Sequence, residues 1–425
     1  MSWYWQYAGL IALSTIVDYR IGLALAREKE QNRRKLLLIA SLGLNLGLLA
    51  LFKYFNFFSA SISDVLTTIG VPVDTLRLDL LLPVGISFYT FQTLSYTIDV
   101  YRRKIPTEHS LLKFATYVAF FPQLVAGPIV RASEFLPQLN APDIDRRADV
   151  SGGLRLVFIG LFKKIVIADL LAFLIVDEVF ANPAAFSSLD LMVGLYAYAF
   201  QIYCDFSGYS DIAIGIALMI GFRLPRNFNK PYLASSPSDF WRRWHITLSE
   251  WLRDYLYISL GGNRGGQLRT TFNLLATMLL GGLWHGAAWN FVLWGGYHGL
   301  LLALTRNVRL AAGSGYLRRI LYISLTFHAV LFGWLLFRVP DMQTLTTFGS
   351  GIVQGTFSSQ IAMLGYMVLG LAVLSHFLPS DFVKQVENRL PRAVRLVAVP
   401  LTQVGLLLLF IGASVGGPVF IYFQF

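Results

Sequence analysis

Charge is the property this sequence lacks most. Asp, Glu, Lys and Arg make up 14% of the 425 residues, whereas hydrophobic residues make up 55%. A soluble protein of ordinary composition carries about 25% charged residues, and a chain with so few cannot cover a water-facing surface. The composition therefore excludes a soluble protein and predicts an all-α polytopic membrane protein.

Cysteine is also almost absent, as are the usual signatures of metal and nucleotide sites. The single cysteine, Cys204, lies inside an apolar run, so it forms no intrachain disulfide and a packing role is expected. The six histidines include no pair at the i, i+4 spacing of a zinc-binding helix and no Cys/His cluster. There is no P-loop, and no Gly-x-Ser-x-Gly elbow accompanies the histidines. We expect no metal and no bound cofactor.

Basic residues give a net charge of +11, but they gather in short runs between apolar segments. The positive-inside rule produces this distribution. The loops at 27–35, 102–104, 306–319 and 381–395 are therefore expected on the cytoplasmic side, and the Lys- and Arg-poor loops at 58–79 and 340–360 outside. The excess charge indicates membrane lipids as its partner and no nucleic acid. An anionic donor at the cytoplasmic face is the alternative.

Long apolar runs are what the sequence does contain. A span takes about 20 residues, and the predicted spans are 4–25, 36–57, 80–100, 153–180, 190–204, 271–283, 287–304, 320–338, 361–379 and 397–413. The run 111–130 is broken by Pro and Gly, which favours a re-entrant or broken span covered by protein. No repeat or long linker divides the chain, so residues 1–425 are expected to form a single transmembrane domain.

Some apolar runs carry charges that a simple anchor would not have. Lys163 and Lys164 interrupt one run, and Asp205 and Asp211 lie in or beside another. Such groups face either a partner of opposite charge or a functional cavity, and the sequence leaves both open. Residues 241–255 differ, because apolar and polar side chains separate onto opposite arcs of a helix. They predict an amphipathic helix at an interface or a cavity rim.

The stretch GGLWHGAAWNFVLWGGYHG, residues 281–299, places His285 and His298 inside an apolar run. A neutral imidazole in such a place is a general base for an alcohol or a nucleophile toward an activated acyl group. A hydrogen-bonded packing role is the alternative. On one continuous helix the two rings would lie about 20 Å apart along the axis and roughly 140° apart around it. A shared site would need a break, which the glycines of this stretch allow.

Three longer motifs, read together, point to a family. DFSGYSDIAIGIALMIGFRLPRNFNKPYL (205–233), DFWRRWHITLSEWLRDYLYISLGGNRGG (239–266) and LLGGLWHGAAWNFVLWGGYHG (279–299) resemble the membrane-bound O-acyltransferase (MBOAT) family. The resemblance is closest to the membrane subunits of bacterial alginate and related polysaccharide O-acetylation systems. Segments 81–102, 120–131 and 420–425 fit the same branch.

The resemblance implies a ring of about ten to eleven transmembrane helices, with re-entrant and interfacial helices, around a narrowed central channel. His285, in Leu-Trp-His-Gly, matches the signature histidine of the family, and His245, in Arg-Trp-His-Ile, matches its second. His298 matches a further histidine of the branch. Its distance from His285 along a continuous helix favours a structural role.

The implied function is O-acyl transfer across the bacterial cytoplasmic (inner) membrane. A cytoplasmic thioester, with acetyl-CoA expected, would supply an acetyl or other short acyl group for an extracytoplasmic polysaccharide, through an extracytoplasmic acetyltransferase partner. His285 would activate the acceptor hydroxyl or carry the acyl group, and His245 would orient the donor or stabilise charge on its carbonyl oxygen. The other candidates, which would line the channel or form ion pairs, are Trp244, Trp284, Arg242, Arg253, Asn263, Asp205, Asp211 and His298.

Three alternatives stay open at this point. A transporter would use the intramembrane Asp and Lys residues without making bonds, and a scaffold subunit of an export complex would not need His285. A teichoic acid D-alanyltransferase shares the Trp-His and Trp-His-Gly motifs. The run Trp-Arg-Arg-Trp-His followed by Gly-Gly-Asn-Arg favours the polysaccharide branch over it.

Overall fold

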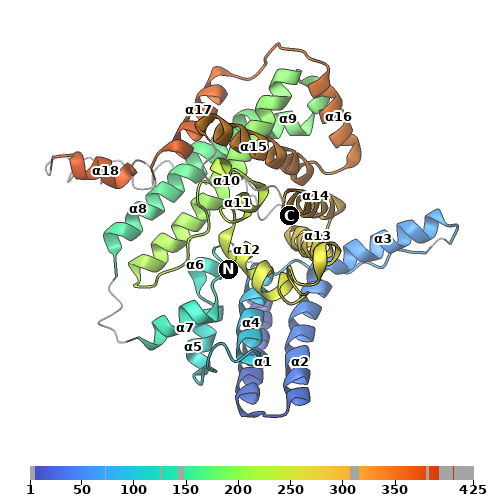
Figure 1. Cartoon of the computed structure of the whole chain (residues 1–425), viewed down its shortest axis with the longest axis vertical. Helices are drawn as coiled ribbons and strands as arrows, with labels where there is room; N and C mark the ends of the chain where they lie inside the picture. The colour runs from blue at the N-terminus through green and yellow to red at the C-terminus, as the bar shows by residue number, and fades with distance from the viewer. Residues whose placement is uncertain are drawn as a thin grey trace.

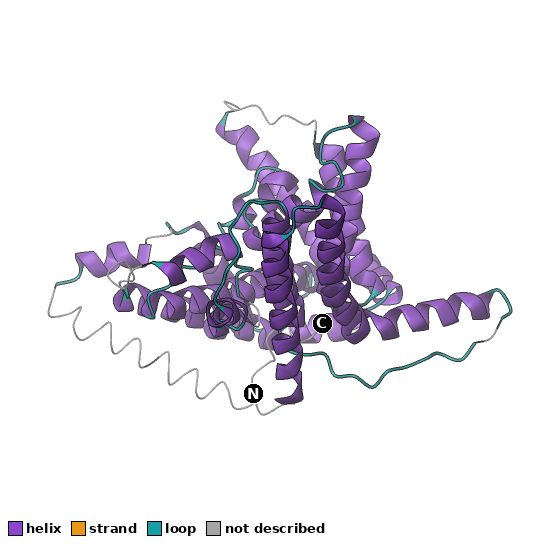
Figure 2. Ribbon diagram, turned by 90° about the horizontal axis from the view of Figure 1, so that it is seen from below, coloured by secondary structure: helices purple, strands orange, loops and turns teal. Residues whose placement is uncertain are grey.

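The computed structural model describes residues 5–71, 73–124, 127–141, 148–306, 315–379, 382–391 and residue 405. Helices account for most of these residues and none of them lies in a strand (Figure 2). The all-α fold class is therefore confirmed. The expected span 397–413, apart from residue 405, and the segment 420–425 lie outside the described residues.

The N-terminal helices pack around α4 (Ile86–Tyr101). The short η1 (Trp5–Tyr7) leads into α1 (Ala8–Arg27), and α1 and α2 (Gln31–Leu49) lie beside α4 (Figure 1). Every residue from Ile86 to Val100 is buried, so α4 is the central helix of this group. Between α1 and α2, the buried carboxylate of Asp18 accepts hydrogen bonds from Ser41 and Asn45, which offset the cost of removing it from water.

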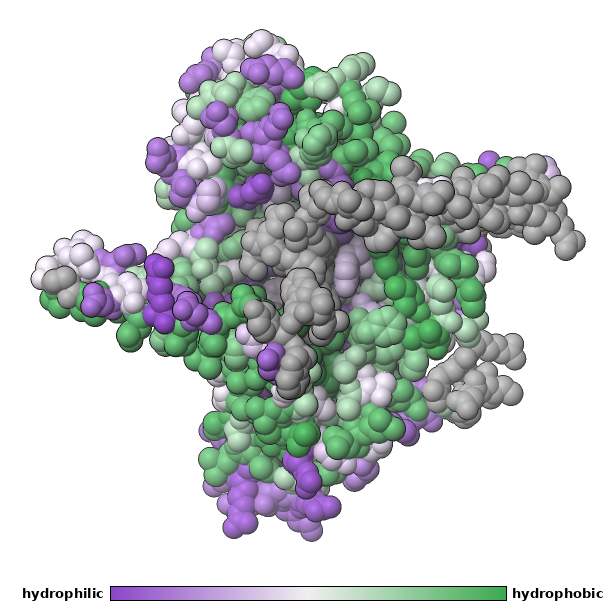
Figure 3. All heavy atoms as spheres, turned by 180° about the vertical axis from the view of Figure 1, so that it is seen from behind, coloured by the Kyte–Doolittle hydropathy of each residue, from purple (hydrophilic) through white to green (hydrophobic). Residues whose placement is uncertain are grey.

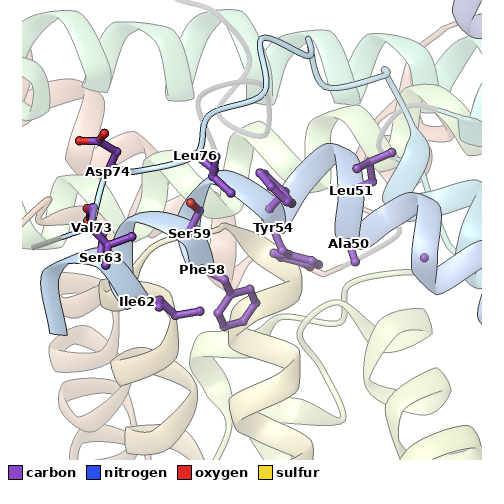
Figure 4. A pocket seen from close by; sticks show the side chains of 12 residues that line it. Ala50, Leu51, Tyr54, Phe58, Ser59, Ile62, Ser63, Val73, Asp74 and Leu76 are labelled. Atoms are coloured by element: carbon purple, nitrogen blue, oxygen red, sulfur yellow. Dashed lines mark hydrogen bonds between the residues drawn. The ribbon is translucent and has the colours of Figure 1, made fainter. Parts of the chain in front are cut away.

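The chain changes direction after α2. The π-helical turn η2 (Ala50–Tyr54) joins α2 to α3 (Phe55–Thr68), and α3 extends away from the body of the molecule (Figures 1 and 2). The chain returns beside α3, where the Asn56 side chain donates to the Leu78 carbonyl and accepts from the Leu78 amide, both at 2.9 Å. A largely apolar groove of about 990 Å³ runs between the two, lined by side chains that include Phe58 and Ile62 (Figure 4).

The run 111–130 is broken, as expected. It forms α5 (Leu111–Val118) and the single turn α6 (Phe121–Leu124). After α7 (Ala132–Asn140) the chain enters a long helical stretch made of α8 (Val150–Leu161), η4 (Phe162–Asp169), η5 (Ala172–Val176) and α9 (Asp177–Ala181).

This stretch packs against α10 (Ser188–Met219), which follows the short η6 (Pro183–Ala185). The predicted span 190–204 is too short, because α10 continues for 32 residues through the polar part of the motif. Its carboxylates are paired, with Lys164 Nζ 2.8 Å from Asp205 Oδ1 and Lys163 Nζ 2.6 Å from Asp211 Oδ2. These four residues therefore form ion pairs, and a channel-lining role for Asp205 and Asp211 stays a prediction.

The helix predicted over 241–255 is confirmed only from Ile246 onward, because residues 242–245 form a break. After η7 (Pro231–Leu233) the region forms α11 (Pro237–Trp241), α12 (Ile246–Trp251) and the π-helical η8 (Leu252–Tyr257). The break ends at His245, whose φ of 41° lies in the left-handed region, a conformation that costs roughly 1–2 kcal/mol for a residue with a Cβ. Backbone hydrogen bonds from Ile246 N to Asn227 O and from Asn229 N to Arg243 O hold the turn, and side-chain periodicity does not register such contacts.

In the C-terminal part of the described chain, α13 (Gly266–His285) and α14 (Trp289–Thr305) form an antiparallel hairpin. α15 (Tyr316–Arg338) packs against α14. They are followed by α16 (Met342–Val353), α17 (Met363–Phe377) and α18 (Phe382–Arg389).

The surface and the helix lengths fit a membrane protein. Apolar side chains cover broad flanks of the molecule, and hydrophilic ones gather at the end formed by the α1–α2 turn (Figure 3). In the described part of the chain, three helical stretches are long and apolar enough to cross a membrane, namely Ala8–Arg27, Gln31–Thr68 and Tyr316–Arg338. Others, such as α4 with 16 residues and α14 with 17, fall short of a full span. The expected ten to eleven spans are not confirmed.

Candidate active site

His285 is the last residue of α13, and α14 begins at Trp289. The helix therefore breaks between His285 and His298, and the two histidines do not lie on one continuous helix. The hairpin needs glycine, because a Cβ on Gly282 would lie 2.2 Å from the Phe291 carbonyl oxygen of the facing helix. Folding back brings both histidines to one indole ring, with Trp294 5.1 Å from His285 and 4.9 Å from His298 between ring centroids.

Lys53 caps the C-terminal end of α13, where His285 lies. Its Nζ, on η2, donates hydrogen bonds to the carbonyl oxygens of Trp284 at 2.6 Å and His285 at 3.0 Å. These carbonyls have no partner within their own helix, and a cation at a helix C-terminus satisfies them and interacts favourably with the helix dipole. Lys53 was not among the predicted site residues. Its signal was a lone lysine inside the predicted span 36–57.

His245 joins the same cluster through Trp284. Its ring lies 6.1 Å from the Trp284 ring, which in turn lies 5.1 Å from His285. On its other side His245 contacts Phe206 of α10 at 4.7 Å. Residues from α10, the turn before α12 and the α13–α14 hairpin thus meet at one point, which we call the histidine cluster: His245, Trp284, His285, Trp294 and His298.

Aromatic side chains enclose the histidine cluster. Phe337 of α15 lies 5.4 Å from His285, and Trp244 lies 4.7 Å from Trp334 in an adjoining layer. His245, His285 and His298 are 0%, 8% and 1% exposed, so the cluster is buried in this structure and only His285 keeps a small accessible area. The ring of helices around a central channel therefore stays a prediction. His298 lies against Gly333 of α15, where a Cβ would come within 2.5 Å of its Nε2.

The remaining predicted site residues lie elsewhere. Arg242 and Asn263 are exposed, and Arg253 pairs with the neighbouring Asp254 at 2.7 Å. Asp205 and Asp211 are in the ion pairs between α10 and η4. The structure therefore brings together His245, His285, His298 and Trp284 of the predicted set, places Trp244 in the adjoining layer, and leaves the charged residues and Asn263 outside the cluster.

Comparison with known proteins decides the family. The model of the MBOAT, membrane-bound O-acyltransferase family matches residues 88–335, which include all three histidines of the cluster. The chain is also 41% identical over 401 residues to the "Probable alginate O-acetylase AlgI" of Pseudomonas aeruginosa, an alignment that covers 91% of this chain and 75% of that protein. The chain belongs to the membrane-bound O-acyltransferase family.

As a member of this family the protein is a membrane enzyme, an O-acyltransferase. Among its relatives, the peptidoglycan O-acetyltransferase of Helicobacter pylori is 37% identical over 380 residues, covering 83% of this chain and 71% of the relative. The teichoic acid D-alanyltransferase of Bacillus subtilis is more distant, with 29% identity over 275 residues, 60% of this chain and 68% of the relative. The non-catalytic transporter and scaffold alternatives are therefore set aside.

Proposed function

We propose that this O-acyltransferase moves an acetyl group from acetyl-CoA on the cytoplasmic side of the bacterial inner membrane to the hydroxyl groups of an extracytoplasmic polysaccharide. A partner protein outside the membrane receives the group and completes the transfer. The names of two relatives, an alginate O-acetylase and a peptidoglycan O-acetyltransferase, support a glycan polymer as the final acceptor. They also favour acetyl over D-alanyl as the group that is moved.

The observation that carries the proposal is the buried contact between His245, Trp284 and His285. Acyl transfer from a thioester needs a group that accepts the hydroxyl proton and a site that excludes water. His285 lies where α13 ends, so its side chain is presented at a helix terminus that Lys53 holds in place. His285 activates the hydroxyl or carries the acyl group, and His245 acts beside it.

A purified protein in lipid nanodiscs, given acetyl-CoA labelled in the acetyl group, tests this function. The expected result is release of CoA together with labelled acceptor when a short oligosaccharide or the partner protein is present. His285→Ala should lower the rate by roughly a hundredfold or more, the size of a lost acid–base contribution. A D-alanyl thioester run in parallel should give no transfer.

His109→Ala is the matched control, because His109 is exposed and lies outside the histidine cluster. It should retain the wild-type rate. Equal rates for His285→Ala and His109→Ala would remove His285 from the mechanism. Transfer from the D-alanyl thioester in place of acetyl-CoA would overturn the proposed donor.

A further inference from the structure

Asn227 contacts His245. It lies inside the motif at 205–233 but was not among the predicted site residues. It lies in the loop that follows α10, and its side chain is buried. Its Oδ1 is 3.1 Å from His245 Nδ1, 2.9 Å from Thr247 Oγ1 and 3.3 Å from the Thr247 backbone nitrogen. One amide side chain thus contacts the histidine and the first turn of the helix that follows it.

The directions of these hydrogen bonds are fixed by groups that can only donate. The backbone N–H of Thr247 cannot accept, so the Asn227 atom that faces it is the carbonyl oxygen, and Nδ2 points toward Ser210 Oγ at 3.3 Å. Thr247 Oγ1 accepts from the backbone N–H of Ile129 at 2.9 Å, which leaves its own hydrogen for Asn227 Oδ1. Because Oδ1 only accepts, Nδ1 of His245 must carry the hydrogen that it donates.

This assignment determines what the rest of the imidazole can do. A neutral imidazole with its hydrogen on Nδ1 has a lone pair and no hydrogen on Nε2. Nε2 of His245 is buried and has no hydrogen-bond partner among the described residues. Backbone hydrogen bonds on both sides of His245 hold it in the left-handed conformation that sets this orientation. Strain held at a buried, unpartnered base is typical of functional sites.

We propose that Asn227 is a positioning residue for acyl transfer, which holds His245 as the Nδ1–H tautomer and thereby makes His245 Nε2 the proton acceptor of the reaction. This inference rests on the proposed function. It also exchanges the roles expected for the two histidines, so that His245 accepts the hydroxyl proton and His285 orients the donor or stabilises charge on its carbonyl oxygen. A ring whose only hydrogen is donated to Asn227 has none to give to the donor carbonyl oxygen.

His245 Nε2 takes the proton of the acceptor hydroxyl while the hydroxyl oxygen forms a bond to the thioester carbonyl carbon. The carbon–sulfur bond then breaks, and the CoA thiolate leaves with the proton from Nε2. The products are an acyl ester and free CoA thiol, and the imidazole returns to its neutral Nδ1–H form.

The surroundings of His245 contain few charges that could titrate with it. His285 on α13 is its titratable neighbour in the cluster, reached through Trp284. The charged groups of the other elements around it are engaged or exposed. Asp205 of α10 is paired with Lys164, Arg226 of the loop donates to the Phe228 carbonyl, Arg243 pairs with Asp239, and Arg242 is exposed.

Substitutions at Asn227 separate a positioning role from a packing role. Asn227→Asp keeps an oxygen for Nδ1–H and adds a negative charge that stabilises the imidazolium. It should therefore retain transfer, and the rising limb of its pH–rate profile should move to higher pH. Asn227→Leu removes the acceptor, and its kcat should fall roughly a hundredfold while KM for acetyl-CoA changes less than threefold. Asn273→Asp, a buried amide elsewhere that donates to the Gly262 carbonyl, is the matched control and should leave the limb unmoved.

An unmoved limb in Asn227→Asp, or a wild-type kcat in Asn227→Leu, would overturn the proposal. A spectroscopic measurement tests the tautomer of His245 independently of the proposed function. In protein labelled with ¹⁵N-histidine, the nitrogen signals lost in His245→Gln should be those of an Nδ1–H tautomer, whatever donor the enzyme uses. An Nε2–H signal there defeats the inference even if transfer from acetyl-CoA is observed. An Nδ1–H signal without any transfer from acetyl-CoA would overturn the proposed donor alone.

Discussion

At the scale of the residue, sequence motifs identified His245 and His285 as site residues but assigned no role to Lys53 or Asn227, although Asn227 lies inside the motif at 205–233. Lys53 and Asn227 act on the cluster from distant or irregular segments of the chain, and their bonds form only when those segments pack together. A lone lysine in an apolar run was a readable signal for Lys53. A buried asparagine in a loop gives no such signal, because its value depends on which donors surround its oxygen.

Gly333 gives a residue-scale prediction about His298. An added methyl group would lie 2.5 Å from His298 Nε2, so Gly333→Ala must displace the ring or move α15. Overpacking of this kind costs typically about 1–3 kcal/mol, and the melting temperature in detergent should fall. Gly370→Ala is the control, since no atom of the described residues lies within 4 Å of its added Cβ. A melting temperature for Gly333→Ala equal to that of the control would mean that His298 has free space around it.

At the scale of the element, hydropathy and periodicity found most helices and missed where they break. The run 153–180 was predicted as one span, and the structure has one uninterrupted helical stretch there, with the π-helical segments η4 and η5 inside it. The helix predicted over 241–255 forms only from Ile246 onward, because backbone hydrogen bonds to residues 227 and 229 hold a break before it. Conversely, the glycines of 281–299 were correctly read as allowing a break, and the hairpin makes it.

Lys53 gives the prediction that belongs to this scale. Lys53→Met removes the donor that satisfies two carbonyls at the end of α13. Hydrogen bonds to charged groups are worth about 1.5–3 kcal/mol, so unfolding should occur at lower denaturant and acyl transfer should slow as His285 loses its fixed backbone. Lys35→Met, at an exposed position of α2, should change neither property. A wild-type transfer rate in a Lys53→Met protein of normal stability would contradict a link between η2 and His285.

At the scale of the whole molecule, composition alone predicted a helical membrane protein, and the family match agrees. The number of spans could not be predicted in the same way. Many helices are shorter than a bilayer is thick, or are joined through π-helical turns, so a hydropathy window does not separate a full span from a partial one. The charge pattern still makes a firm prediction about the two sides of the membrane.

Cysteine labelling tests that prediction, because Cys204 is buried and is the chain's only cysteine. In a Cys204→Ala background, Asp74→Cys should react with a membrane-impermeant maleimide on intact spheroplasts, since 58–79 is expected outside. Lys29→Cys should react only after the membrane is opened. Both positions are exposed. Labelling of both from one side would show that the basic loops do not set the orientation.

The closed aromatic walls around His245, His285 and His298 have a kinetic consequence for the proposed reaction. Reactants can reach the fully buried ring of His245 only when part of the walls separates, and the walls must close again to exclude water. Turnover is then governed by a breathing motion of the helices as well as by bond making. An activated acyl group held behind such walls is protected from water. In the absence of an acceptor, the enzyme should therefore hydrolyse its acyl donor only slowly.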